Sequence, residues 1–340
     1  MKRAARAALA LALAGCGRPA ALDPAGPQAA RIADLWWLSF AVVAAVYAAV
    51  LVALALAVAR GRRARRESAG DGPPAPRPPD PARTRRIALV IGAASAASAA
   101  VLLVLLVASV RTGRAIARAE REHPLVVEVT GRQWWWSVRY ADGRASEWFE
   151  TANEIHLPVG RSIRLALSAG DVIHGFWVPA LHGKRDLIPG RANELFLRVE
   201  RPGTYVGRCA EFCGHQHAKM QILVVAEAPE AFEAWRARQR GPAREPRNEA
   251  ERRGREVFLS SSCPLCHAIR GTSAGGQAGP DLTHLASRAR IAGNWLPNAP
   301  GHLAGWVLDS QAVKPGNRMP PNLLPGPDVQ ALLAYLRSLE

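Results

Sequence analysis

The sequence predicts a multidomain membrane protein in which a two-helix transmembrane hairpin precedes an all-β domain and a C-terminal all-α domain. Three observations support this fold class: two long uncharged apolar stretches, a middle region of short β-rich segments, and helical apolar spacing on both sides of a Cys-x-x-Cys-His motif. At 340 residues the chain is long enough for two globular domains besides the membrane segments.

The extreme N-terminus predicts a segment that is removed from the mature protein. Three basic residues precede a short apolar run that ends in Leu13-Ala-Gly-Cys16, which is typical of a bacterial lipoprotein signal with Cys16 as the lipidated residue. An ordinary signal peptide with an incidental cysteine is the alternative. In either case residues 1–15 do not belong to the fold, and residues 16–33 form an N-terminal tether.

Two apolar stretches predict the transmembrane helices, at residues 34–60 and 87–110. Residues 35–59 and 87–110 contain no Asp, Glu, Lys or Arg. Each is long enough to cross roughly 30 Å of hydrocarbon. Buried core helices of a soluble protein are the alternative, but such lengths rarely lack a charge there.

The loop at 61–86 sets the predicted orientation. The segment between the two apolar stretches carries nine arginines against three acidic residues, which favours the cytoplasmic side. The chain after residue 110 then lies on the periplasmic side of a bacterial inner membrane. Much of the net charge of +16 belongs to this loop and the signal, so the sequence gives no reason to expect nucleic acid as a partner.

Residues 123–226 predict the all-β domain. Short runs with alternating or β-branched apolar residues indicate strands of an antiparallel sandwich or barrel, and the pattern alone does not exclude an immunoglobulin-like sandwich. These runs lie at 125–129, 154–157, 162–167, 194–199 and 221–225. Residues 227–248 mix Ala, Glu, Arg, Gln and Pro and are expected to be a partly helical, flexible linker.

Residues 249–340 predict a small haem-binding domain. Cys263-Pro-Leu-Cys266-His267 is the c-type haem attachment signature, in which two thioether bonds hold the porphyrin and the adjacent imidazole ligates iron. A thioredoxin-like dithiol is the alternative. Apolar residues at helical spacing in 250–259 and 329–339 predict two terminal helices.

Four soft or imidazole ligands are crowded into twelve residues of the β domain: Cys209, Cys213, His217 and Met220. With His174 upstream, they supply two thiolates, two imidazoles and a thioether, a set that favours a pair of copper ions. A tetrahedral zinc site or a disulfide between the cysteines would leave Met220 without a role.

These residues resemble subunit II of the haem-copper cytochrome c oxidases, whose dinuclear CuA centre uses Cys-x-Glu-x-Cys-x3-His-x2-Met after a distant Asp-x-x-His. Every ligand position of that pattern is present. Gln133-Trp134-Trp135-Trp136 and Asp186-Leu-Ile-Pro-Gly-Arg191 extend the resemblance over most of residues 34–226. It implies a cupredoxin fold for the β domain.

The resemblance also implies roles for three further residues. Glu211 offers its backbone carbonyl to one copper and its carboxylate to a Mg²⁺ shared with subunit I. Asp171 orients the loop that carries His174, and Trp134, directly after the glutamine, is where electrons reach the copper.

The C-terminal domain resembles class I cytochrome c. Gly279-Pro280-Asp281-Leu282 is similar to the segment whose proline carbonyl accepts the N–H of the haem-ligating histidine, and Asn317-Arg318-Met319-Pro320 is similar to the loop of the axial methionine. A Met319 ligand would keep the haem potential high. His284 and His302 leave bis-histidine ligation as the alternative.

Together the resemblances imply a non-catalytic electron-transfer subunit of an aa3-like cytochrome c oxidase with haem c. Its implied partners are subunit I with haem a, haem a3 and CuB, subunit III, membrane lipid, and cytochrome c or another periplasmic or membrane electron donor. The electron-accepting subunit of a CuA-containing nitric oxide reductase is the main alternative. A lipoprotein that stores copper is another, against which the two membrane helices and the covalent haem argue.

Overall fold

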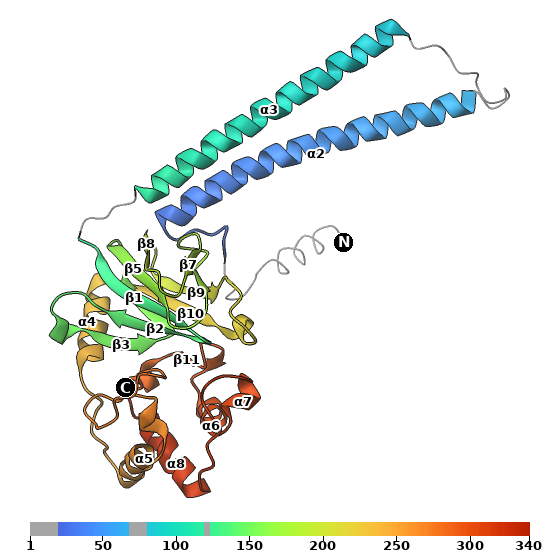
Figure 1. Ribbon diagram of the computed structural model, residues 1–340. Coiled ribbons are helices and arrows are strands. Elements are labelled where there is room, and N and C mark those ends of the chain that lie inside the picture. Colours follow the sequence, from blue (N-terminus) through green and yellow to red (C-terminus); the bar gives the residue numbers. More distant parts are fainter. Residues whose placement is uncertain (1–19, 68–79, 119–122) are drawn as a thin grey trace, which may run out of the picture. The chain divides into compact units, whose positions relative to one another are not determined.

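The computed structural model describes residues 20–67, 80–118 and 123–340 (Figure 1). Cys16 and the signal sequence lie outside the described residues. The chain divides into two compact units, one formed by residues 31–118 and the other by the flanking segments.

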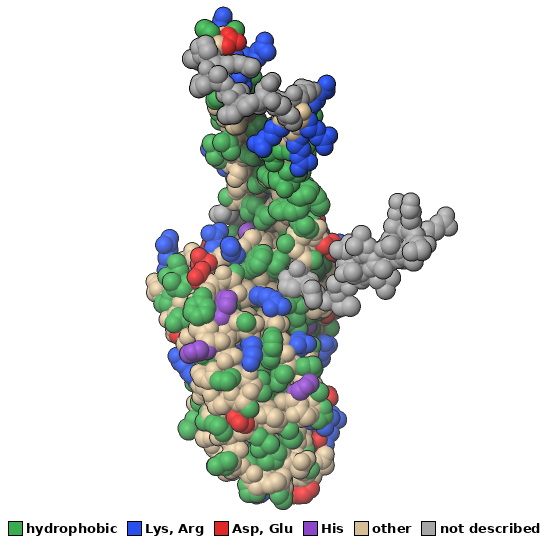
Figure 2. Space-filling model, turned by 90° about the vertical axis from the view of Figure 1, so that its right-hand side faces the viewer, with side chains coloured by type: hydrophobic (Ala, Val, Ile, Leu, Met, Phe, Trp, Pro, Cys, Tyr) green, Lys and Arg blue, Asp and Glu red, His purple; other side chains and the backbone are tan. Residues whose placement is uncertain are grey.

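The first unit consists of two long helices, α2 (Pro27–Glu67) and α3 (Pro81–Ala117). Each contains an 18-residue window of high mean hydropathy, 2.8 and 2.5, in which no residue is buried, so both are long and apolar enough to cross a membrane. Figure 2 shows apolar side chains along the helices and basic side chains clustered at the ends that the 68–79 segment joins. Asp80 caps α3 by accepting the Ala82 N–H.

The second unit contains a sandwich of two five-stranded sheets. One has the order β3-β2-β1-β5-β8 and the other β4-β10-β9-β6-β7. The strands are β1 (Leu125–Arg132), β2 (Trp135–Tyr140), β3 (Phe149–Ala152), β4 (Glu154–Pro158), β5 (Ser162–Ala169), β6 (His174–Trp177), β7 (Arg185–Leu187), β8 (Asn193–Arg198), β9 (Gly203–Cys209) and β10 (Gln221–Glu227).

Alternating side chains explain why these segments form a sandwich. Buried residues alternate along β1 and most of β5, among them Val127, Val129 and Leu165, and they share one core cluster with Ile222 and Val224 of the opposite sheet. The pairing differs from the expected antiparallel arrangement, because β1 pairs parallel with β5 and β4 pairs parallel with β10. Alternation reveals which face of a strand is buried, but it does not encode the direction of the neighbouring strand.

Helix α4 (Pro229–Arg240) occupies part of the predicted linker and packs on the sandwich. Phe232 and Trp235, three residues apart, bury their rings against Tyr140, and the Trp235 ring stacks on His156 with centroids 4.1 Å apart. The helical part of the expected linker is therefore packed, because its Phe232 and Trp235 belong to the sandwich core.

The C-terminal domain is helical: α5 (Glu249–Ser260), α6 (Pro300–Leu308), α7 (Ser310–Val313) and α8 (Gly326–Leu336), with a short hairpin of β11 (Arg290–Ile291) and β12 (Leu296–Pro297). Helices α5 and α8 are the two predicted terminal helices, and they cross closely at Gly254. A Cβ added there would lie 2.0 Å from the Ala331 carbonyl oxygen, so only glycine permits this approach. The predicted fold class is confirmed: two long apolar helices, an all-β sandwich and an all-α C-terminal domain.

Candidate copper and haem sites

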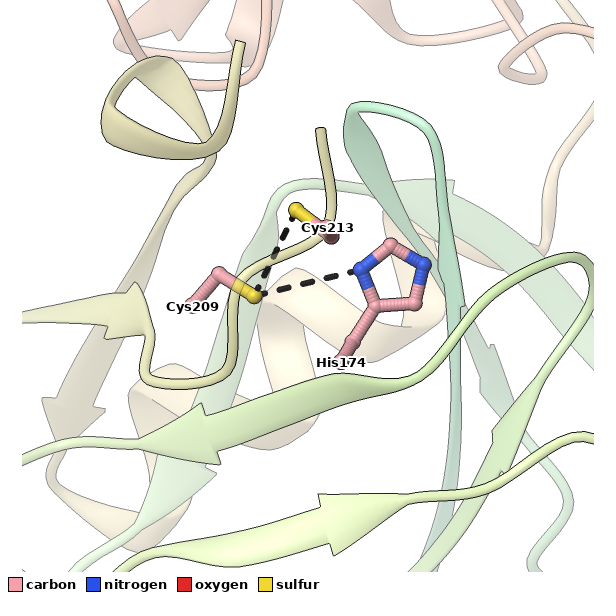
Figure 3. A group of neighbouring side chains, drawn as sticks. All are labelled: His174, Cys209 and Cys213. Atoms are coloured by element: carbon pink, nitrogen blue, oxygen red, sulfur yellow. Dashed lines mark hydrogen bonds between the residues drawn. The ribbon is translucent and has the colours of Figure 1, made fainter. Parts of the chain in front are cut away.

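Three of the predicted copper ligands converge at one end of the sandwich. The Sγ atoms of Cys209 and Cys213 are 3.7 Å apart, and Cys209 Sγ lies 3.9 Å from His174 Nδ1 (Figure 3). All three ligand atoms lie within 4.8 Å of one another. His174 begins β6 and Cys209 ends β9, and these strands are antiparallel neighbours, so the sheet itself brings the two side chains together.

The other three predicted ligands surround the same sulfur atoms. His217 Nδ1 lies 3.5 Å and Met220 Sδ 3.8 Å from Cys213 Sγ, and the Glu211 carbonyl oxygen lies 3.1 Å from Cys209 Sγ. The sulfurs are too far apart for a disulfide, in which they are about 2.0 Å apart. Two bridging thiolates, two imidazoles, a thioether and a carbonyl suit copper better than zinc.

Backbone hydrogen bonds hold the ligand loop in place. The Cys209 N–H donates to the Met220 carbonyl (3.0 Å), so the two ends of the loop are joined where β9 and β10 pair. The Ala210 N–H donates to the Gly175 carbonyl (2.8 Å), which ties the loop to β6. A Cβ on Gly175 would lie 2.9 Å from the Glu211 N atom, so the approach of strand and loop requires glycine.

Asp171 orients the buried imidazole of His174. Its Oδ1 lies 2.8 Å from His174 Nε2, which leaves Nδ1 facing the sulfurs, and its Oδ2 accepts the Gln133 N–H at 2.7 Å. Burial raises the pKa of Asp171, but the hydrogen bonds from His174 and Gln133 outweigh it and hold this pKa below its usual value.

The two thiols differ in acidity although they are neighbours. The hydrogen bond with Cys213 lowers the pKa of Cys209 to about 4, and a second one from His174 acts in the same direction. The same contact, together with burial, raises the pKa of Cys213. The two sulfur atoms are therefore expected to share one proton at neutral pH, and a bound metal ion would displace it.

The predicted haem residues line a single cavity of about 370 Å³. Cys263, Cys266, His267 and Met319 all face it. Much of the remaining wall is apolar, as a porphyrin requires: Leu282, Leu285, Ile291, Leu303, Trp306 and Val307. These residues fit a covalently attached haem.

Short loops position the two predicted iron ligands. The Pro280 carbonyl lies 2.7 Å from His267 Nδ1 and so fixes the ring. Gly279 lies under the ring, where a Cβ would be 2.6 Å from His267 Cε1. On the Met319 loop, Asn317 Oδ1 accepts the Met319 N–H at 2.8 Å.

The histidines considered for bis-histidine ligation are not on the cavity wall. His284 is buried and both its ring nitrogens lie against carbonyls, Glu340 O at 2.6 Å and Gly241 O at 3.1 Å. His302 lies in α6 and does not line the cavity either.

Trp134 connects the two sites. It lines the haem cavity together with Gln133 and Asp171 of the sandwich. Its indole Nε1–H donates to the carbonyl of Cys213 at 2.8 Å, and the side-chain amide of Gln133 donates to the same oxygen at 2.8 Å. The sequence predicts a role for Trp134 only through its resemblance to the family motif. Its contact with the haem domain could not be predicted, because that contact depends on how the two domains dock.

Two other features adjoin the copper loop. Lys314 is buried beside Trp134, which the sequence does not indicate because lysines are usually exposed. On the other side, the exposed Glu211 lines a hollow of about 340 Å³ with Asp186 and Arg191.

Comparison with known proteins gives concordant matches to both globular domains. Residues 142–227 match the family described as cytochrome c oxidase subunit II, periplasmic domain, and residues 251–340 match the family described as cytochrome c. The cytochrome c oxidase subunit 2 of Alkalihalophilus pseudofirmus is 35% identical over 98% of this chain and 95% of its own length. That of Bacillus subtilis is 28% identical over 97% of this chain and 95% of its own length.

Among solved structures, the periplasmic domain of subunit II of cytochrome oxidase from Bradyrhizobium japonicum is 34% identical. The match covers 34% of this chain and 92% of that chain, with a TM-score of 0.32.

Proposed function

The chain belongs to the cytochrome c oxidase subunit II family and carries a C-terminal cytochrome c domain, and on this premise we propose that it relays electrons from a donor through haem c and a dinuclear CuA centre to haem a of subunit I, where dioxygen is reduced. The chain itself catalyses no bond-making step. Its residues bind the redox centres, fix the distance between them and set their potentials.

One observation carries this proposal: the cavity that fits haem c and the sulfur cluster that fits copper meet at Trp134. Its indole N–H contacts the carbonyl of the copper ligand Cys213, while the residue also lines the wall of the haem cavity. A single residue therefore adjoins both sites. This supports Trp134 as the point where electrons reach the copper.

The ligand assignments follow from the same geometry. Haem c would be attached by Cys263 and Cys266 and ligated by His267, with Pro280 orienting the imidazole and Met319 as the second axial ligand. Copper would be held by the six groups around the two sulfur atoms, His174, Cys209, Glu211, Cys213, His217 and Met220. Copper bound by these residues would supply a one-electron redox couple, with the thiolates of Cys209 and Cys213 as its sulfur ligands.

The same proposal extends to the surroundings of the chain. The carboxylate of Glu211 would bind a Mg²⁺ shared with subunit I; it is exposed beside Asp186 in a hollow that Lys184, Arg185 and Arg191 also line. The protein would cross a bacterial inner membrane twice, with Cys16 lipidated and both redox domains in the periplasm, next to subunit III and a cytochrome c or other donor. Mass spectrometry of the mature N-terminus tests the lipid.

Stopped-flow mixing of the oxidised complex with a reduced cytochrome c tests the relay. The absorbance of haem c should change first and that of the copper centre second. This order is expected because Trp134, the proposed path to the copper ligand Cys213, lines the haem cavity. Copper reduction ahead of haem c would contradict the proposal.

A further inference from the structure

Lys314 is an unusual buried cation at the junction of the two globular domains. Only 2% of the residue is exposed. Its Nζ atom lies 2.6 Å from the Trp134 carbonyl oxygen, 3.3 Å from that of Lys219 and 3.3 Å from that of Ala292. An ammonium has three N–H donors, so the three carbonyl oxygens match its hydrogen-bonding capacity.

These acceptors come from both domains. Trp134 and Lys219 belong to the sandwich, on either side of the copper site, and Ala292 belongs to the turn between β11 and β12 of the cytochrome domain. Next to Ala292, Gly293 has φ +70° and accepts the Gln221 N–H at 3.0 Å. A Cβ on Gly293 would lie 2.8 Å from both Lys314 Nζ and the Trp134 carbonyl oxygen, so the domains touch as closely as glycine permits.

The residues on either side of Lys314 also contact the copper loop. Lys219 Nζ donates to the Val313 carbonyl at 2.5 Å, and the Gln216 side chain donates to the Pro315 carbonyl at 2.9 Å. A Cβ on Gly316 would lie 3.8 Å from Trp134 Cη2, in ordinary contact with the indole. The segment 313–316 therefore covers the copper loop and Trp134 together.

A buried cation is tolerated only when its donors are satisfied. Burial, and secondly the charge of Lys219, lower the pKa of Lys314 to about 7. The charge of Cys213 raises this pKa to a smaller extent, and the three carbonyl oxygens supply hydrogen-bond acceptors for the ammonium. Removing the Nζ would leave all three oxygens without this donor inside the junction, which costs more than losing the same contacts at a surface.

We propose that Lys314 is a positioning residue that fixes the cytochrome domain on Trp134, so that electron transfer from haem c to copper takes place in one docked arrangement. This inference rests on the proposed function and identifies Lys314 as the residue that fixes the two domains for electron transfer. In this arrangement a buried cation holds the cytochrome domain on the sandwich, so that the domain does not move freely on the linker at 227–248.

Hydrogen exchange of the complete oxidase, followed by mass spectrometry, tests the docking without turnover. The Lys314→Met variant keeps the length and apolar stem of the side chain but has no N–H donor. We expect amide exchange of the Gln221 peptide to accelerate by about tenfold, the effect of leaving buried acceptors unpaired. The control is Arg252→Met, which removes an exposed cation of α5 that pairs only with Glu249 among its described contacts.

The second readout is the rate of electron transfer from haem c to copper after rapid photochemical reduction of the haem. Lys314→Met should slow it, while the copper paramagnetic resonance and the haem absorption spectrum stay as in wild type. Lys314→Gln, whose amide has two N–H donors for three carbonyls, should give intermediate exchange and an intermediate rate. This variant decides the outcome if the methionine variant fails to assemble.

Wild-type exchange of the Gln221 peptide in either Lys314 variant would overturn the proposal, as would an effect no larger than that of Arg252→Met. A wild-type complex in which haem c never reduces copper would count against the proposed function instead. The exchange experiment separates the two failures because it requires no electron transfer.

Discussion

The copper site and the haem site differ in how much of each is built by the polypeptide. In the sandwich, strand ends and a hairpin loop already hold the sulfur atoms 3.7 Å apart, with Met220 fully buried beside them. In the cytochrome domain, the corresponding ligands line a cavity of about 370 Å³ inside a small helical core. We therefore expect the sandwich to fold without copper, whereas haem would form part of the core of the cytochrome domain.

The largest expected effect is the loss of haem attachment. In Cys263→Ser/Cys266→Ser the haem would no longer be attached in a cavity of about 370 Å³ with a largely apolar wall, and the lost apolar contacts should cost on the order of several kcal/mol. That is comparable with the whole stability of a small domain. We expect α5 and α8 to lose their amide protection in hydrogen exchange while the copper signal persists. A haem-free domain as protected as the wild type would show that the cavity does not depend on haem.

Loss of a copper ligand should have the opposite effect: the metal signal is lost, but the domain stays folded. Cys213→Ser should abolish the seven-line mixed-valence signal in electron paramagnetic resonance. The sandwich should lose only about 1–2 kcal/mol, the usual cost of a buried polar substitution. Thermal unfolding and the haem c spectrum provide the comparison. A surviving seven-line pattern would refute the ligand assignment. Unfolding of the sandwich would refute the claim that this domain folds without copper.

Copper uptake by the metal-free protein should weaken as the pH falls. Because the pKa of Cys209 is lowered to about 4 while that of Cys213 is raised, the pair of thiols should keep one proton through the neutral range. Each site must therefore release one proton when it binds copper, and the apparent affinity should fall about tenfold per pH unit.

The decrease should steepen once His174, whose pKa the contacts with Cys209 and Asp171 raise against the effect of burial, also becomes protonated. Competition with a chelator at several pH values measures the slope. A flat profile across the neutral range would mean that both thiols are already ionised.

The smallest expected effect concerns the Met319 loop, which is held by the side chains of Ser310, Gln311 and Asn317 rather than by a sheet. Asn317 accepts the Met319 N–H at 2.8 Å and donates to the Lys314 carbonyl at 2.7 Å. Asn317→Ala should weaken methionine ligation by about 1 kcal/mol, the value of a typical hydrogen bond. The methionine-to-iron charge-transfer band during a denaturant titration reports this; an unchanged midpoint would mean that the loop is fixed by other contacts.

The sequence predicts the parts of this protein whose pattern is local. Apolar length reveals the helices α2 and α3, and alternation reveals strands such as β1 and β5. The short strands β6 and β9 are missed because they carry ligands and glycines instead of a regular apolar pattern. Helix α4 lies where a partly helical linker is expected, but the packing of Phe232 and Trp235 on the sandwich is not evident from the sequence.

The same limit applies to the sites. Both ligand sets follow from motifs, since a metal or a haem requires fixed residue types at fixed spacing. The junction between them does not, because Lys314 and Gly293 contact backbone carbonyls of the other domain, and any sequence supplies carbonyls. Docking of two domains depends on shape rather than on a motif.

The central claim is that the haem and copper sites meet at Trp134, and one kinetic comparison tests it most directly. Trp134→Phe keeps an aromatic ring but removes the N–H that binds the Cys213 carbonyl, and Trp148→Phe is its control. Trp148 donates its indole N–H to the Gly143 carbonyl at 3.4 Å and lines neither site.

After photochemical reduction of haem c, the time course of copper reduction is recorded in both variants. We predict that Trp134→Phe slows it while Trp148→Phe retains the wild-type rate, with copper and haem spectra unchanged in both. Equal rates in the two variants would contradict the claim that electrons pass between the sites at Trp134.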